Sequence, residues 1–270
     1  MSRTRLIGAA CAVALVAAPA AAEAQSRPTI TMSGSTTVAP LAAKLARTYL
    51  RQYPRRVKFR LAQGGSDVGV ADVAAGRVTI GNSSRDPKPS DPGGIFFNKI
   101  ARDALCIVTN SANRVPDMSA STVQAIFSGR FRDWSQVPGS TISGPINVNV
   151  RTPASGSQDA FDKIFMGGPG KITDSAARRA SSGLIAQAVR GDRNAVGYVS
   201  LAFTNGLNDP SYKGVGCTLR DAKSGAYEGS RNLWMVTRGR PTGPIQKFIT
   251  WVQQSKRAAK VIASEWVPLQ

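Results

Sequence analysis

Short apolar runs alternate with amphipathic segments along most of this 270-residue chain, and this alternation constrains the fold more than any other feature of the sequence. Apolar runs with the length of strands cover residues 29–33, 57–62 and 78–81. Between them, residues 38–51 carry apolar side chains at helical spacing, and a second helix is expected over residues 68–75. This order predicts an α/β fold with crossover helices packed on a sheet.

The same alternation continues through the second half of the chain. Further strands are expected at residues 104–109, 146–150, 195–199 and 233–237. Further helices are expected at residues 119–127, 158–165 and 243–263. Turn-rich loops are expected at residues 86–94 and 135–144. No internal repeat interrupts this pattern.

The amino terminus has the pattern of a secretory signal. Arg3 and Arg5 precede an apolar run over residues 6–18, and small residues lead to a cleavage site after Ala24. The run is too short for a transmembrane helix, which needs about 20 apolar residues. We therefore predict that residues 1–24 are a signal peptide and that the mature protein is periplasmic, with a chain long enough for one large domain or two lobes.

The cysteines fit export. Cys11 lies inside the apolar run rather than at its end, so a lipid-anchored protein is the minor alternative. Once the signal is removed, Cys106 and Cys217 remain as an even pair in an oxidising compartment. The sequence leaves two possibilities open, a disulfide between these residues or two separate buried thiols.

Histidine is absent from the whole chain, which excludes several kinds of enzyme. Histidine is the commonest general base and a common ligand for zinc and copper. A phosphatase or phosphoryl transferase that used Ser35, Ser66 or Ser155 as nucleophile would lack that base, and no cluster of carboxylates offers a metal site. We predict a protein without catalytic residues, metal or cofactor.

The mature chain is predicted to be strongly basic. Removing the signal takes two arginines and one glutamate from 35 basic and 16 acidic residues, which leaves 33 and 15 and a net charge of +18. Such a charge raises the local concentration of anions. A polyanion-binding surface is an alternative, but the chain has no zinc-ligand spacing and no RNA-recognition motif. We therefore expect that the protein does not bind nucleic acid, and we also expect it to be a monomer.

Small hydroxyl residues and glycine coincide at three predicted junctions between a strand and a helix. The junctions are Ser33-Gly34-Ser35-Thr36-Thr37, Gly64-Gly65-Ser66-Asp67, and residues 151–157 with Ser155-Gly156-Ser157. Each would present backbone N–H groups, hydroxyls and the positive end of a helix dipole to one anion. One such loop alone would be an ordinary helix cap. Three in one chain favour an oxyanion site.

Two arginines lie close to these loops. Arg151 precedes Ser155 by four residues, so a strand end can direct its guanidinium toward the start of the next helix. Arginine suits bidentate contact with tetrahedral oxyanions. A fourth loop, residues 81–85, follows the third strand and ends with Ser84 and Arg85.

This ordered set of loops resembles the PstS family, the phosphate-binding subunits of ABC-type phosphate importers. The similarity extends over nearly all of the mature chain and includes the further segments 125–129 with Trp134, 197–199, 225–233 and 267–269. The resemblance implies an α/β protein with the two-lobe periplasmic binding protein type II fold, in which each lobe is a mixed sheet flanked by helices. It also implies that lobe I comprises residues 28–103 and 215–270, that lobe II comprises residues 104–214, and that both cysteines lie near the crossings.

The resemblance also implies a function and a set of contacts. The protein would capture inorganic phosphate between its lobes and deliver it to the membrane permease of an ABC transporter, without chemistry. By position, the phosphate contacts would be Thr36, Thr37, Ser66, Ser84, Arg151, Ser155, Gly156 and Ser157. We add Arg85 because of its charge and position, with a surface salt bridge as the alternative.

One departure from the family concerns Ser84. Many members have an aspartate there, which accepts the proton of bound hydrogen phosphate. In this chain the acceptor would be Asp67 or the Ser84 hydroxyl. A carboxylate that faced the anion would reject sulfate, which offers no proton. The sequence therefore leaves sulfate, molybdate or another oxyanion open as the ligand, and transport or phosphate sensing open as the role.

Overall fold

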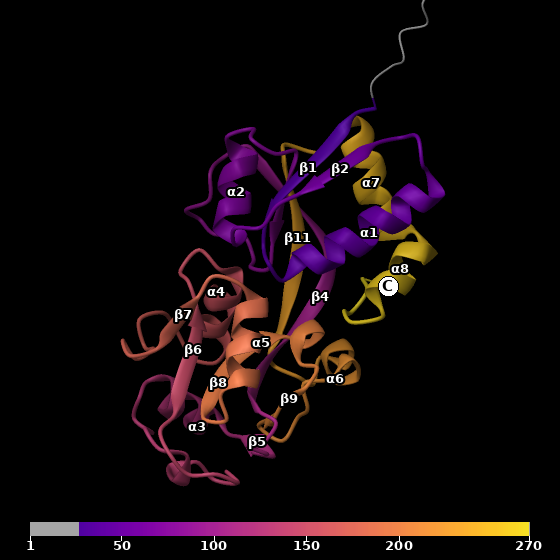
Figure 1. The fold of residues 1–270 in the computed structure, drawn as a ribbon. Helices are drawn as coiled ribbons and strands as arrows, with labels where there is room; N and C mark the ends of the chain where they lie inside the picture. The colour runs from indigo at the N-terminus through magenta and orange to yellow at the C-terminus, as the bar shows by residue number, and fades with distance from the viewer. Residues whose placement is uncertain (1–26, 270) are drawn as a thin grey trace, which may run out of the picture.

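The structure, a computed structural model, describes residues 27–269 and has two lobes joined by extended segments (Figure 1). The predicted signal peptide, with its cleavage site after Ala24 and with Cys11, lies outside the described residues. Within the described part of the chain, no helix is long and apolar enough to cross a membrane.

Lobe I contains a mixed sheet whose strands follow the order β2-β1-β3-β11-β4. Its strands are β1 (Thr29–Gly34), β2 (Lys58–Leu61), β3 (Ile80–Ser83), β11 (Ser230–Arg238) and the first part of β4 (Ile95–Asn110). The first three strands are parallel, and β11 is antiparallel to both β3 and β4. The predicted order of strands and helices at the start of the chain is confirmed.

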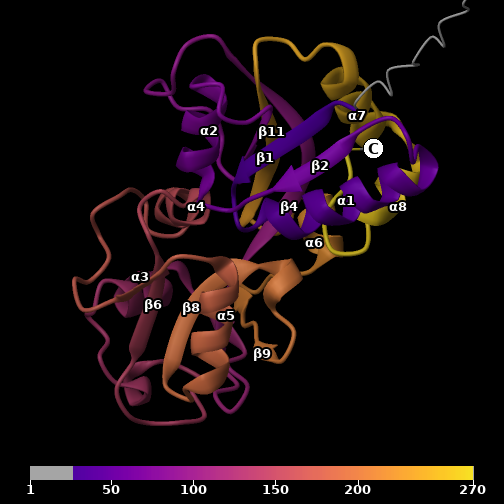
Figure 2. The ribbon, with the colours of Figure 1, turned by 45° about the horizontal axis from the view of Figure 1, so that its top comes forward.

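Helices cover both faces of this sheet (Figure 2). They are α1 (Val38–Gln52), α2 (Ser66–Ala74), α7 (Gly243–Gln254) and α8 (Lys256–Ile262). Helix α1 forms because Leu41, Leu45 and Tyr49 repeat at a spacing of four residues and give it one apolar face, which is buried. On the other face of the sheet, α2 packs on β1, β3 and β11.

Lobe II contains the second mixed sheet, in the order β4-β8-β6-β7. Its further strands are β6 (Asn147–Arg151), β7 (Ala177–Arg179), β8 (Ala195–Ser200) and β9 (Leu207–Asn208), which pairs with β4. Its main helices are α3 (Ala120–Phe127), α4 (Gly156–Ile164) and α5 (Ser182–Gly191). Smaller elements complete it, namely β5 (Asp117–Met118), β10 (Ser211–Tyr212), α6 (Leu219–Ser224) and the short 3-10 turns Trp134–Gln136 and Leu201–Phe203.

Strand β4 belongs to both sheets and forms one of the two connections between the lobes. Ala104 still pairs with Ser230 of β11, whereas the next residue, Leu105, pairs with Ser200 of β8. The second connection runs into β11 and begins later than expected from the sequence. Because Cys217, Ala222 and Tyr227 belong to the core of lobe II, the boundary expected at Val215 is better drawn near Ser230.

The structure joins Cys106 and Cys217 in a disulfide. Cys106 follows the point where β4 changes sheets, and Cys217 lies on the segment that leads to the second connection. The bond therefore ties the two connecting segments together on the lobe II side.

The structure corrects one predicted helix and adds another that was not predicted. The single helix expected over residues 243–263 is divided at Ser255, whose backbone is extended and whose hydroxyl accepts a hydrogen bond from the N–H of Arg257. A serine cap has therefore started a new helix inside an apolar pattern that alone suggested a continuous one. Helix α5, which was not predicted, begins after Ser181, whose hydroxyl accepts from the N–H of Leu184.

Candidate functional site: a buried network of hydroxyls and arginines between the lobes

The amino-terminal ends of α1 and α2 from lobe I face those of α4 and α5 from lobe II. Direct contacts join the facing ends, because the side chain of Thr37 touches Ser157 and that of Thr36 touches Ser182. The partial positive charges of helix amino termini therefore gather at one place between the lobes. Such a gathering favours a negatively charged ligand.

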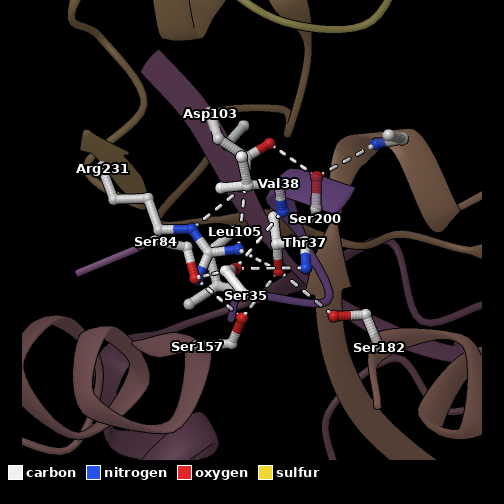
Figure 3. A network of polar contacts seen from close by, with 12 residues as sticks. Ser35, Thr37, Val38, Ser84, Asp103, Leu105, Ser157, Ser182, Ser200 and Arg231 are labelled. Atoms are coloured by element: carbon white, nitrogen blue, oxygen red, sulfur yellow. Dashed lines mark hydrogen bonds and ion pairs between the residues drawn. The ribbon is translucent and has the colours of Figure 1, made fainter. Parts of the chain in front are cut away.

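Hydroxyl groups from both lobes form the centre of this place (Figure 3). Thr37 Oγ1 lies 3.0 Å from Ser157 Oγ and 3.2 Å from Ser182 Oγ. Thr36 Oγ1 lies 3.3 Å from Ser182 Oγ. All four side chains are buried. Thr36, Thr37 and Ser157 were predicted contacts, and the structure brings them together.

A second group of hydroxyls lies in lobe I. Ser35 Oγ donates to Ser84 Oγ at 2.9 Å, and Ser66 Oγ lies 3.4 Å from the same oxygen. The backbone N–H of Ser84 donates to Ser66 Oγ at 3.0 Å. Ser66 and Ser84, both predicted from the sequence, are therefore in contact with each other and fully buried.

Gly156 lets lobe II approach this second group closely. A Cβ atom at Gly156 would collide with Ser66 Oγ and with the backbone between Ser84 and Arg85. Only a glycine allows α4 to begin so near to the loops of lobe I. Its neighbour Ser155 caps α4, since its hydroxyl accepts from the N–H groups of Ser157 and Gln158.

Arg151 ends strand β6 and is only 1% exposed. Its Nη1 donates to Ser182 Oγ at 3.1 Å, and its other nitrogens donate to the backbone carbonyls of Arg179 and Ala180. Within residues 27–269, no acidic side chain lies within ion-pair distance of this guanidinium. Burial lowers the pKa of Arg151 to about 10, as expected for a cation without a counter-charge.

Arg231, on β11, reaches the same hydroxyls from another direction. Its Nη1 donates to Ser157 Oγ at 2.8 Å, and its Nη2 lies 3.4 Å from Thr37 Oγ1. Its Nε and Nη2 donate to Asp103 Oδ2 at 3.0 and 2.9 Å. Ser200 donates to the other carboxylate oxygen of Asp103 at 2.6 Å. The two groups of hydroxyls, together with Arg151 and Arg231, are called the network below.

Ser182 and Arg231 were not among the predicted contacts. Ser182 had a signal that could have identified it, because Ser181-Ser182-Gly183 has the same combination of hydroxyls and glycine at a helix start as the other loops. Arg231 had no such signal in the sequence, because it lies within strand β11 and is distant in sequence from every loop of this kind.

Arg85 and Asp67 are placed differently from the prediction. Arg85 Nε donates to Asp67 Oδ1 at 2.6 Å, and both Nη atoms donate to Asp91, at 2.9 and 2.6 Å. The guanidinium is therefore occupied by carboxylates and does not join the hydroxyl network. The salt-bridge alternative describes it better, although the Arg85 side chain is buried rather than on the surface. Asp67 is turned toward Arg85 instead of toward the network.

A cleft of about 620 Å³ opens beside the network. Arg231 is the residue that the cleft and the network share, and Lys88 and Asp159 form an ion pair of 2.6 Å between the lobes at its wall. In the described part of the chain, no group of three or more His, Cys, Asp or Glu side chains could hold a metal ion. The hydroxyl and guanidinium donors of the site are of the kind that binds oxyanions.

Comparisons with known proteins agree with this architecture. A sequence model of the PBP superfamily domain matches residues 19–256. The phosphate-binding protein PstS of Bacillus subtilis strain 168 is 23% identical over 256 residues, which cover 92% of this chain and 83% of that protein. The phosphate-binding protein PstS of Staphylococcus epidermidis is 25% identical over 222 residues, which cover 76% and 67%.

Solved structures are similar over most of their length. A putative phosphate ABC transporter substrate-binding protein from Clostridium perfringens, with bound phosphate, has a TM-score of 0.85 and 26% identity, and the match covers 90% of this chain and all of that one. An ABC-type phosphate transport receptor from Vibrio cholerae has a TM-score of 0.72 and 24% identity, with 88% and 99% covered. The two-lobe fold is the type II periplasmic binding protein fold expected from the sequence, and the chain belongs to the PBP superfamily, in which the PstS proteins are its relatives.

Proposed function

We propose that this protein is the phosphate-binding subunit of an ABC-type phosphate importer. It captures inorganic phosphate between its lobes in the periplasm and delivers it to a membrane permease. The observation that carries the proposal is Arg151, a buried guanidinium that contacts one hydroxyl and two backbone carbonyls but no carboxylate. A buried charge without a partner costs several kcal/mol, so an anion at this place stabilises the closed protein.

The network has the donors that a phosphate ion needs. Hydrogen bonds to a charged group contribute about 1.5–3 kcal/mol each, and a micromolar dissociation constant corresponds to about 8 kcal/mol. Hydroxyls of both lobes and the helix starts behind them supply several such bonds. The anion enters while the lobes are apart and replaces the contacts between hydroxyls as the hinge closes.

Similarity to phosphate-binding proteins supports phosphate as the ligand. The relatives from Bacillus subtilis and Staphylococcus epidermidis are described as phosphate-binding proteins, and the Clostridium perfringens structure holds phosphate. The implied contacts Thr36, Thr37, Ser66, Ser84, Arg151, Ser155, Gly156 and Ser157 remain part of the proposal. Arg85 and Asp67 are left out of it because they pair with each other.

Sulfate is the second candidate ligand, and the position of Asp67 favours it. With Asp67 held by Arg85, the Ser84 hydroxyl is left as the proton acceptor of the two that the sequence offered. A hydroxyl can accept a hydrogen bond or donate one, so it repels sulfate less than a carboxylate would. We expect phosphate to bind more tightly than sulfate, with a smaller preference than a carboxylate would give.

Calorimetric titration of refolded, phosphate-free mature protein tests the proposal. We expect tight binding of one phosphate per chain that changes little between low and high salt, because the site is buried. Affinity that falls steeply with salt would instead indicate a polyanion-binding surface. No heat with any oxyanion, or turnover of a chromogenic phosphate ester, would overturn the proposed function.

A further inference from the structure

We propose that Arg231 is a further anion-contacting residue, supplied by the hinge itself, and that Asp103 is the residue that positions it. The inference rests on the proposed function, since it concerns the same site. In this proposal, the bound anion touches the pair of strands that joins the lobes, in addition to the loops of each lobe.

The position of Arg231 in the sheet is the first observation. Arg231 lies opposite Asp103 in the β11–β4 ladder. The next residue of β4, Ala104, is the last to pair with β11, and Leu105 already pairs with β8 of lobe II. The Arg231–Asp103 pair therefore stands at the point where the chain passes from one lobe to the other.

The division of the Arg231 donors is the second observation. An arginine side chain has five N–H donors in a planar fork. The Nε edge of Arg231 is held by one oxygen of Asp103, while Nη1 and Nη2 extend to Ser157 of lobe II and Thr37 of lobe I (Figure 3). A purely structural ion pair would not need that second edge to end among the hydroxyls of both lobes.

The surroundings of Asp103 are the third observation. Its carboxylate is fully buried and is bound by Arg231 from lobe I and by Ser200 from lobe II. Asp103 therefore fixes the direction of the guanidinium at the hinge rather than facing the network itself. It acts through Arg231 and is a positioning residue.

The balance of charge is the fourth observation. Arg151 and Arg231 bring two buried positive charges to one group of hydroxyls, and Asp103 supplies one negative charge. The network keeps an excess of one positive charge, which a phosphate ion between the two guanidinium groups would offset. Both arginines donate to its hydroxyls, through Ser182 and Ser157, so one anion can contact both.

A pair of neutral substitutions tests the inference. Arg231→Gln combined with Asp103→Asn removes both charges of the ion pair, so that neither member is left as a buried charge without the other. We expect phosphate to bind at least about tenfold more weakly, because one charge-assisted contact is lost. The loss should be larger in mildly alkaline buffer, where phosphate carries two charges, than in acidic buffer.

The matched control is Arg77→Gln with Asp72→Asn. Asp72 likewise accepts hydrogen bonds from a serine, Ser33, and from an arginine, Arg77, but lies outside the network. This control should leave phosphate affinity unchanged. If the Arg231 and Asp103 variant fails to fold, Arg231→Lys keeps the charge and removes the planar fork, and phosphate is expected to bind more weakly because the two-edged contact is lost.

The outcomes separate the inference from the proposed function. Wild-type phosphate binding with an unchanged constant in the folded variants would overturn the role of Arg231 and leave the proposed function in place. An equal loss at both pH values would also overturn it, because a structural pair would act without regard to the charge of the ligand. A wild-type protein that binds no phosphate would overturn both.

Discussion

Arg85 and Arg151 lie near the ends of strands in opposite lobes, and both side chains are almost completely buried, yet their surroundings differ in kind. Arg85 is enclosed by two carboxylates, Asp67 and Asp91. Arg151 donates to one hydroxyl and two backbone carbonyls. A buried arginine whose charge is balanced stabilises its own lobe, whereas one without a counter-charge is available to a ligand.

The largest effect that we expect from changing either arginine is a loss of stability in Arg85→Ala. Removing one member of a buried ion pair leaves the other charge unpaired and costs about 3 kcal/mol. We expect a clear fall in the free energy of unfolding, measured with urea, and a phosphate affinity close to that of the wild type. If Arg85→Ala lowered the affinity for phosphate but not the free energy of unfolding, the roles assigned to Arg85 and Arg151 would be reversed.

Arg151→Ala should show the opposite behaviour. It removes a buried charge that has no acidic partner, so stability should change little, while phosphate should bind at least about tenfold more weakly. Calorimetric titration beside urea denaturation separates the two quantities. Unchanged affinity in a folded variant would remove Arg151 from the site.

Gly156→Ala should weaken phosphate binding by roughly tenfold, because a methyl group there meets Ser66 and the backbone at Ser84 and hinders closure of the lobes. The control is Gly183→Ala near the start of α5, where the nearest atom to an added Cβ is Ser181 Oγ at 3.8 Å. This control should bind phosphate like the wild type. Equal affinities for the two variants would mean that the close approach of α4 is not needed for binding.

The smallest expected effect concerns how much the ion pair between Arg85 and Asp91 stabilises the protein in acid. Burial by itself raises the pKa of Asp91, but hydrogen bonds from Arg85 and from the Lys88 N–H outweigh it and hold the pKa below its usual value. The stabilisation is therefore present above a pH of about 4, the pKa in the unfolded chain, and is lost as the pH falls through the lower pKa of the folded state.

Urea denaturation of the wild type and of Asp91→Asn measures this effect. We expect the wild type to be more stable at neutral pH and the difference to shrink in strong acid. If the difference in stability between the two proteins stays constant with pH, the charge of Asp91 does not contribute to stability. Asp91 would then not be the counter-charge of Arg85.

Features of this protein that depend on neighbouring residues could be predicted from the amino-acid sequence. The apolar spacing of Leu41, Leu45 and Tyr49 specified α1, and the capping hydroxyl of Ser155 with the adjacent Gly156 specified the start of α4. The absence of histidine from the sequence excluded an enzyme that depends on a histidine side chain. These signals are local, because helix spacing and capping act over a few residues.

Which buried arginines have a carboxylate partner could be seen only in the tertiary structure. Arg231 meets Asp103 across 128 positions of sequence, and Arg85 meets Asp67 across 18 and Asp91 across six. Spacing in the sequence therefore does not show which carboxylates each arginine will contact. The sequence showed hydroxyl loops and nearby cations but could not distinguish Arg85 from Arg151. The physical reason is that a side chain's electrostatic surroundings arise from packing between distant segments, whereas the elements that carry it are set locally.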